Sequence, residues 1–211
     1  MNDTESEVLQ AIRLNTDETC ALFSNAGLKW RERTTVRGFL RALRINHDDR
    51  EIIKRGPEPV DVHFRQARFQ VTEILDKGRR RSFELKQRSR RANNADCLLD
   101  LANPWAPSRA MPPDELLALV TERSIEKARR YQTSLTGIDL LIYVNLQNRH
   151  FYPEPPFLEA SFLAASGWRS VSMVMGQCGI VLWAEIDAPA CLSERVGSVQ
   201  VSPTHDDSLF A

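Results

Sequence analysis

Apolar residues recur at helical spacing in three long segments of the chain. Residues 7–23 and 113–132 predict two helices, the second with proline at its first turn and basic residues near its last. Residues 28–44 predict a third, in which arginines cover much of the surface that the apolar stripe leaves open. These amphipathic helices need an apolar surface to pack against.

That surface is predicted by segments rich in β-branched and aromatic residues. Residues 60–64 and 68–75 flank a short link and predict a β-hairpin. Residues 138–146 are almost continuously apolar, which is typical of a central strand covered on both faces. Strands at 169–175 and 179–185 complete the sheet. The order of elements predicts an α/β sandwich with a central mixed sheet flanked by helices.

The domain organisation follows from the length and from the breaks in the pattern. With 211 residues, 42% of them hydrophobic, the chain is long enough to bury one good core. We predict a single domain over residues 1–192, including the N-terminal helices, and a polar tail over residues 193–211. Two proline-rich stretches, residues 102–113 and 152–157, are predicted to form ordered surface loops.

Composition narrows the classes of function. Twenty-eight basic residues balance twenty-eight acidic ones, so affinity for an anionic polymer must come from local clusters of charge. We find no secretory leader and no long apolar span, which predicts a soluble cytoplasmic protein. The four cysteines form no CxxC pair, and no glycine-rich phosphate loop occurs, which argues against a zinc ribbon and a nucleotide-binding loop.

The predicted hairpin carries the most informative polar residues. If the two phenylalanines that flank its turn close the hairpin, Asp61 opposes Thr72 and His63 opposes Gln70. Alternation along the strands then places these four side chains on one face and the apolar ones on the other. A one-residue slip would bring Glu73 to that face instead. Polar groups inside apolar strands cost stability unless they are paired, so their convergence favours a functional role.

The hairpin resembles the PD-(D/E)xK nuclease pattern. That pattern places a carboxylate after proline at the start of a strand, and an acidic or amide residue, any residue and then usually lysine on the next strand. The matching residues here are Pro59 and Asp61, followed by Gln70, Val71 and Thr72.

A broader resemblance covers roughly residues 20–190. The stretches 23–40, 58–81 and 167–174 are similar to the bacterial family called domain of unknown function 1780. Its members are described as endonuclease candidates with a restriction-endonuclease-like fold. The resemblance therefore implies that fold and a metal-dependent hydrolysis of nucleic-acid phosphodiester bonds, with Mg²⁺ as the cofactor.

The resemblance also implies roles for individual residues. Asp61 would be the metal-binding carboxylate, Gln70 would take the second ligand position, and the carbonyl of Val71 would add a further oxygen. Glu32, in the predicted helix before the hairpin, matches an additional acidic residue of such nucleases. Thr72 stands where lysine is usual and brings no positive charge.

Other residues could compensate for the missing lysine. Glu73 lies on the same strand and Lys77 just beyond it, while Glu84 and Lys86 form a literal ExK in a segment predicted to be helical. The alternative function is a catalytically inactive nuclease-fold protein that binds nucleic acid or a protein partner.

A basic run follows the hairpin, and residues 79–91 are predicted to be helical. Its cations would neutralise phosphates without reading sequence, which predicts nucleic-acid binding, with DNA as the expected partner. A solvated helix is the competing interpretation. Cutting both strands of a duplex needs two sites, which favours a homodimer. The predicted binding residues are Arg79, Arg80, Arg81, Lys86 and Arg88.

Overall fold

The computed structural model describes residues 3–22, 28–53, 58–102, 107–131, 135–151 and 160–201. Contacts group them into two compact units: a helical unit drawn from residues 1–31 and 77–107, and an α/β unit drawn from residues 32–76 and 108–210. The sequence had predicted one domain over residues 1–192. In the described part of the chain, no helix has the length and hydropathy needed to cross a membrane.

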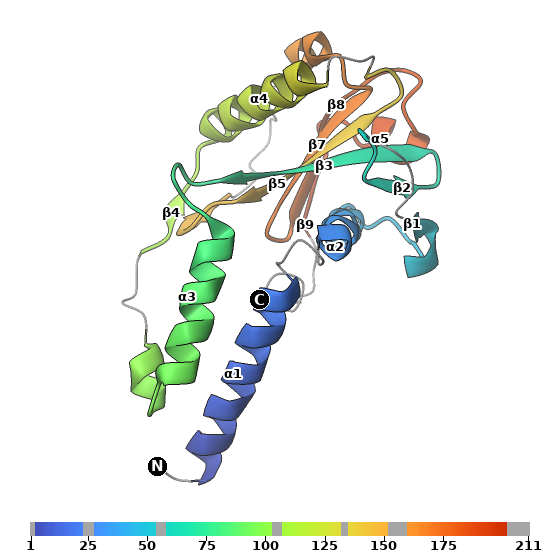
Figure 1. Cartoon of the computed structure of the whole chain (residues 1–211). Helices are drawn as coiled ribbons and strands as arrows, with labels where there is room; N and C mark the ends of the chain where they lie inside the picture. The colour runs from blue at the N-terminus through green and yellow to red at the C-terminus, as the bar shows by residue number, and fades with distance from the viewer. Residues whose placement is uncertain are drawn as a thin grey trace. The chain divides into compact units, whose positions relative to one another are not determined.

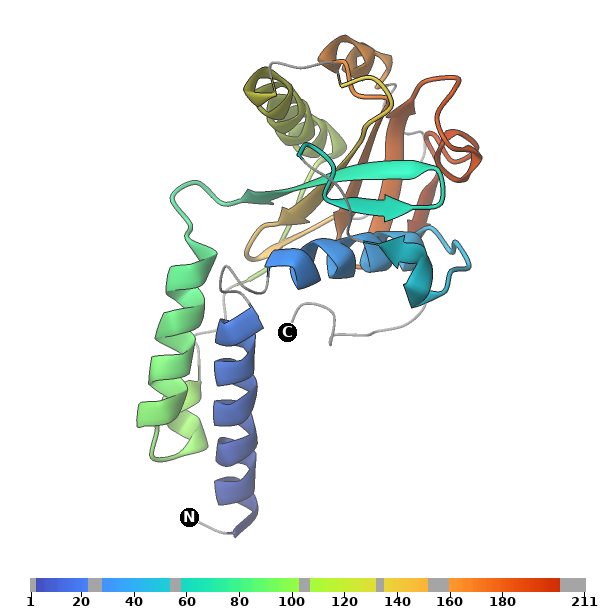
Figure 2. The same cartoon turned by 45° about the vertical axis from the view of Figure 1, so that its right-hand side comes forward.

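The helical unit consists of α1 (Asp3–Leu22), α3 (Arg81–Asn94) and the 3-10 helix η3 (Leu98–Leu101). Helices α1 and α3 lie side by side (Figure 2). The side chain of Arg13 donates to the carbonyls of Ala92 and Ala95 at 3.1 and 2.7 Å, and Ser89 donates to Asp17 at 2.6 Å. These bonds hold the last turns of α3 against α1 in antiparallel orientation.

The α/β unit is built on a seven-stranded sheet (Figure 1). Strands β3, β5 and β7 are parallel, whereas the other neighbours pair antiparallel, so the predicted mixed sheet is confirmed. In their order across the sheet, the strands are β1 (Ile52–Ile53), β2 (Val62–Phe64), β3 (Ala67–Leu75), β5 (Asp139–Asn145), β7 (Ser170–Met175), β8 (Cys178–Ala184) and β9 (Val199–Val201).

A second strand pair and several helices complete this unit. Strands β4 (Arg109–Ala110) and β6 (Arg149–His150) form a separate parallel pair. The helices are α2 (Leu28–Ala42), η2 (Asp49–Glu51), α4 (Pro113–Arg130), η4 (Ser161–Ser166) and α5 (Ala190–Ser193), with α2 belonging to the α/β unit from residue 32 onward.

Two apolar clusters form the core, one on each face of the sheet. Phe39 and Leu40 of α2 pack on Phe69 of β3, and Val120 of α4 packs on the opposite face with Trp168. Strand β5 is buried along almost its whole length, as its continuous apolar sequence predicts. Helices therefore cover both faces, and the predicted sandwich is confirmed (Figure 1).

The predicted tail differs from the structure over its first residues. Residues 199–201 pair with β8 as the last strand of the sheet, because Val199 and Val201 alternate with a polar residue and extend an open sheet edge. Residues 202–211 lie outside the described part of the chain, as do residues 103–106 and 152–159 of the predicted proline-rich loops.

A buried carboxylate ties the three parallel strands together. Asp139, which is 0% exposed, accepts hydrogen bonds from the backbone N–H of Arg68 at 2.9 Å and from Ser170 at 2.8 Å. It also forms an ion pair with Arg169, whose side chain is 12% exposed. These partners come from β3 and from the start of β7, so Asp139 aligns the strands on either side of β5.

We predict that Asp139→Ala lowers the free energy of unfolding by about 3–5 kcal/mol, because the guanidinium of Arg169 would stay buried without its counterion. Urea denaturation measures the change. Glu122→Ala, at an exposed carboxylate on α4, should change stability by less than about 0.5 kcal/mol. Similar losses in the two variants would contradict the prediction.

Candidate active site

The turn of the β2–β3 hairpin is shorter than the sequence predicts. Arg65 and Gln66 form a two-residue turn, with Arg65 in the left-handed region at φ 51°, and Phe64 pairs with Ala67. The predicted closure between the two phenylalanines was therefore wrong, since the ladder begins two residues earlier on β3.

This shift changes the partners but not the faces. His63 pairs with Arg68 rather than with Gln70, and Asp61 contacts Gln70 rather than Thr72. Because side chains alternate along a strand, a shift of two positions leaves each of them on the same face. The predicted polar face of the hairpin is therefore retained.

Asp61 lies directly before β2 and extends the pairing of the hairpin by one residue. Its backbone N–H donates to the carbonyl of Phe69 at 2.8 Å, and its Oδ2 accepts the backbone N–H of Val71 at 2.9 Å. The same Oδ2 accepts Nε2 of Gln70 at 2.5 Å. A half-buried carboxylate thus takes the place of a backbone acceptor in the ladder.

Gln70 connects this carboxylate to the other side of the site. The side chain is buried, and its Nε2 also donates to the carbonyl of Val71 at 3.0 Å. Its Oε1 accepts the hydroxyl of Tyr131, which follows directly after α4, at 2.6 Å. The amide nitrogen therefore lies between two oxygen atoms, while the amide oxygen faces the tyrosine.

Helix α4 brings a cation to the same region. Lys127 lies one helical turn before Tyr131, with its Nζ 5.6 Å from the centre of the tyrosine ring. Burial, followed by the charge of Arg130, lowers the pKa of Lys127, whereas the charge of Asp61 acts in the opposite direction. The lysine is therefore partly desolvated and within electrostatic range of the Asp61 carboxylate.

Three carboxylates act on the tyrosine through their charge. Burial raises the pKa of Tyr131, and the charges of Asp61, Glu58 and Glu32 raise it further. Glu32, a residue predicted for the site, is 9% exposed on α2. Within the described residues, no group of three or more His, Cys, Asp or Glu side chains is placed to hold a metal ion together. Glu32 therefore influences the site through its charge rather than as part of a carboxylate cluster.

The other predicted strand residues differ in placement. Thr72 is buried on the same face as Gln70. Glu73 turns to the opposite face, where its Oε1 accepts Nδ2 of Asn145 at 2.9 Å. Glu73 does not join Asp61, because the hairpin register has not slipped by one residue.

The residues of the predicted basic run belong to the helical unit, and they differ in their contacts and in their exposure. Arg79 donates to both carboxylate oxygens of Glu84 at 2.8 Å, so the acid of the literal ExK is paired with an arginine. Arg81 is half-buried, whereas Arg80 and Lys86 are exposed.

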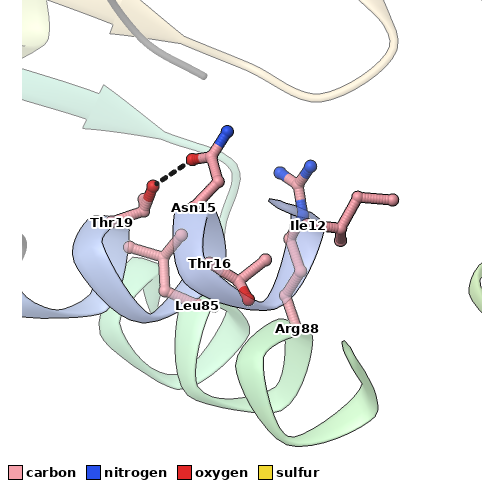
Figure 3. A pocket seen from close by; sticks show the side chains of 6 residues that line it. All are labelled: Ile12, Asn15, Thr16, Thr19, Leu85 and Arg88. Atoms are coloured by element: carbon pink, nitrogen blue, oxygen red, sulfur yellow. Dashed lines mark hydrogen bonds between the residues drawn. The ribbon is translucent and has the colours of Figure 1, made fainter. Parts of the chain in front are cut away.

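Arg88 lies against α1. It lines a small pocket of about 70 Å³ with Leu85 and with four residues of α1, and Figure 3 shows its side chain beside Asn15 and Ile12. The pocket is formed where α1 and α3 pack together. Arg88 therefore contributes to the helix pair as well as to the charge of α3.

Lys127 and Tyr131 were missed by the sequence analysis. Their spacing of four residues shows that they share one face of a helix. The sequence contains no signal that this face meets the hairpin, because the contact depends on how α4 packs on the sheet.

The model of the family described as "Putative endonuclease, protein of unknown function (DUF1780)" matches residues 4–205. The chain belongs to this family. The resemblance drawn from the sequence is therefore confirmed at the level of the DUF1780 family. No curated protein gives a significant match.

A solved structure also resembles this DUF1780 chain. It is a protein of unknown function from Pseudomonas aeruginosa strain PAO1, described as belonging to the monooxygenase superfamily. It is 25% identical, covers 95% of this chain and 96% of its own, and superposes with a TM-score of 0.65. The mixed α/β fold is shared, whereas membership of the restriction-endonuclease-like group stays a prediction.

We predict that Asp61→Asn lowers the pKa of Tyr131, because the substitution removes a negative charge that opposes ionisation of the phenol. Ultraviolet titration of the phenolate, with Tyr131→Phe as the reference that identifies its signal, measures the change. Asp187→Asn should leave the titration curve as it is. An unaltered Tyr131 pKa in Asp61→Asn would contradict the arrangement described above.

Proposed function

We propose that this DUF1780 protein hydrolyses phosphodiester bonds of nucleic acid in a Mg²⁺-dependent reaction at Asp61, Gln70 and Val71. The observation that carries the proposal is the position of the Gln70 amide nitrogen, 2.5 Å from Asp61 Oδ2 and 3.0 Å from the carbonyl of Val71. Because both oxygens lie within hydrogen-bond distance of the same amide nitrogen, small local shifts would let a cation in place of that nitrogen contact both of them.

The donor set fits Mg²⁺. This ion binds through one or two carboxylates and keeps several waters, so a large carboxylate cluster is not required. Rotation of the Gln70 amide would present its oxygen beside Asp61. The hydroxyl of Tyr131 can accept the amide nitrogen as well as donate to the amide oxygen, so that contact would survive the rotation.

The surrounding side chains supply the remaining chemistry. A bound Mg²⁺ would polarise the phosphate and lower the pKa of an attached water. Lys127 provides the positive charge that Thr72 lacks, in a partly desolvated position where it stabilises developing negative charge effectively. Tyr131 orients both Lys127 and Gln70 through its ring and its hydroxyl.

Exposed cations at the N-cap of α3 and within the helix support a nucleic-acid substrate. Arg80 and Lys86 are exposed and suited to phosphate contacts that do not depend on sequence. DNA is the substrate that we propose, and cleavage of both strands in one event would require a homodimer with two such sites.

A second candidate function is favoured by a specific observation. Asp61 is the one carboxylate in the direct donor set, and its Oδ2 already accepts Gln70 and Val71. A protein with this site could bind nucleic acid without cutting it. Metal titration of the full chain separates the two functions, because the inactive binder would take up no Mg²⁺.

The first functional prediction concerns Asp61→Asn. We expect a loss of at least about a hundredfold in cleavage, because the charge that holds the cation is removed. The fold should persist, since the asparagine oxygen can still accept the N–H of Val71. Cleavage of labelled DNA in Mg²⁺ and in EDTA measures the effect. Glu122→Gln, at an exposed carboxylate on α4, serves as the matched control, and full activity in Asp61→Asn would refute the proposal.

The second functional prediction concerns Lys127. We expect Lys127→Met to reduce the rate of cleavage by about a hundredfold, because an aliphatic side chain of similar length carries no charge. Lys127→Arg should restore part of the rate. The same cleavage assay at saturating DNA measures both variants. Equal rates for Lys127→Met and the parent protein would show that the positive charge comes from elsewhere.

A further inference from the structure

Helix α3 has one face that packs and one that does not. Ala92 is 1% exposed, and Ser89 donates to Asp17 of α1, so this side of α3 is covered. The opposite side carries exposed side chains, among them a phenylalanine that is 58% exposed. We call this side the α3 outer face, and it comprises Phe83, Lys86, Gln87 and Arg90.

The charges of α3 give this face a positive character. The one carboxylate of the helix, Glu84, is bonded through both oxygens by Arg79. Arg91 is engaged in a structural role, since it donates to the carbonyls of Asp100 and Ala102 at 2.8 and 2.7 Å. The α3 outer face therefore presents two exposed cations and no carboxylate.

The phenylalanine lies among these polar side chains. Lys86 and Gln87 follow Phe83 by three and four residues, which places them beside it on the helix surface. Arg90 follows by seven residues, about 10 Å further along the helix axis. A single exposed phenylalanine is ordinary on a protein surface. A ring with cations beside it can bind nucleic acid, because a base can stack on the ring while the neighbouring phosphates bind the cations.

We propose that the α3 outer face binds single-stranded nucleic acid, with a base stacked on Phe83 and the backbone held by Lys86 and Arg90. In a duplex the faces of the bases are already stacked on each other, so the ring would add little. The inference that unpaired strands are the substrate class of the enzyme rests on the proposed nuclease function. The inference that single strands bind here rests on the α3 outer face alone.

Fluorescence anisotropy with the full chain tests the proposal. The probes are a labelled oligothymidine of about 20 nucleotides and a duplex of equal length, both in EDTA so that metal-dependent cleavage plays no part. We expect Phe83→Ala to weaken single-strand binding by about tenfold and to leave duplex binding nearly unchanged. Phe83→Trp should retain single-strand affinity, and Phe83→Leu should lose it, because the contact needs an aromatic face.

The charged residues give a second, separable result. Lys86→Ala combined with Arg90→Ala should weaken binding to both probes and flatten the dependence of affinity on salt. Leu99→Ala, an exposed apolar residue of the same unit at 82% exposure, and Arg50→Ala, an exposed cation of the α/β unit, are the matched controls and should change little.

Three outcomes would overturn the proposal. They are equal affinity of the parent protein for the two probes, a Phe83→Ala variant that behaves like Leu99→Ala, and a Phe83→Leu variant that binds as well as Phe83→Trp. Circular dichroism confirms that each variant is folded. Because all binding is measured in EDTA, failure of the nuclease proposal would appear only in the cleavage assay and would leave this result intact.

Discussion

The hydrogen bond from the backbone of Val71 to the carboxylate of Asp61 joins the fold of the hairpin to its candidate chemistry. Strand β2 starts only after Asp61, so a side chain provides the acceptor that a neighbouring strand would otherwise provide. The bond also fixes where the carbonyl of Val71 and the side chain of Gln70 lie. The oxygen atoms of the site are therefore positioned by the pairing of two strands, which is more rigid than a cluster of long side chains.

The topology of the sheet explains how a distant lysine reaches this hairpin. Strands β3 and β5 are parallel neighbours, and such strands must be joined by a crossover connection. Helix α4 lies within that crossover and packs on the face that carries Gln70. Its last turn and the residue that follows therefore place Lys127 and Tyr131 beside the hairpin. The same crossover contains residues 77–107, which form the helical unit together with residues 1–31 and include the basic α3.

Two carboxylates in the α/β unit show how environment separates structural from chemical roles. Asp139 is 0% exposed and is bound by donors from β3 and from the start of β7, including a guanidinium that balances its charge. Such a carboxylate already has hydrogen-bond donors and a counterion, and it acts as a structural link. Asp61 is half-buried and accepts hydrogen bonds from a side-chain amide and a backbone N–H. Its electrostatic partners, Lys127 and Tyr131, come from a different element and have shifted pKa values, as expected for a site that handles charge.

Local pattern alone determined the main helices, the hairpin, the buried central strand and the mixed α/β class, because periodicity and composition report on nearby residues. It also determined which hairpin side chains share a face, since that depends only on alternation. The tertiary structure decided the hairpin partners through the left-handed turn at Arg65, and it separated Glu73 from Asp61. It alone revealed Lys127, because a contact between a helix and a strand far apart in the chain depends on parallel pairing and packing that no local pattern encodes.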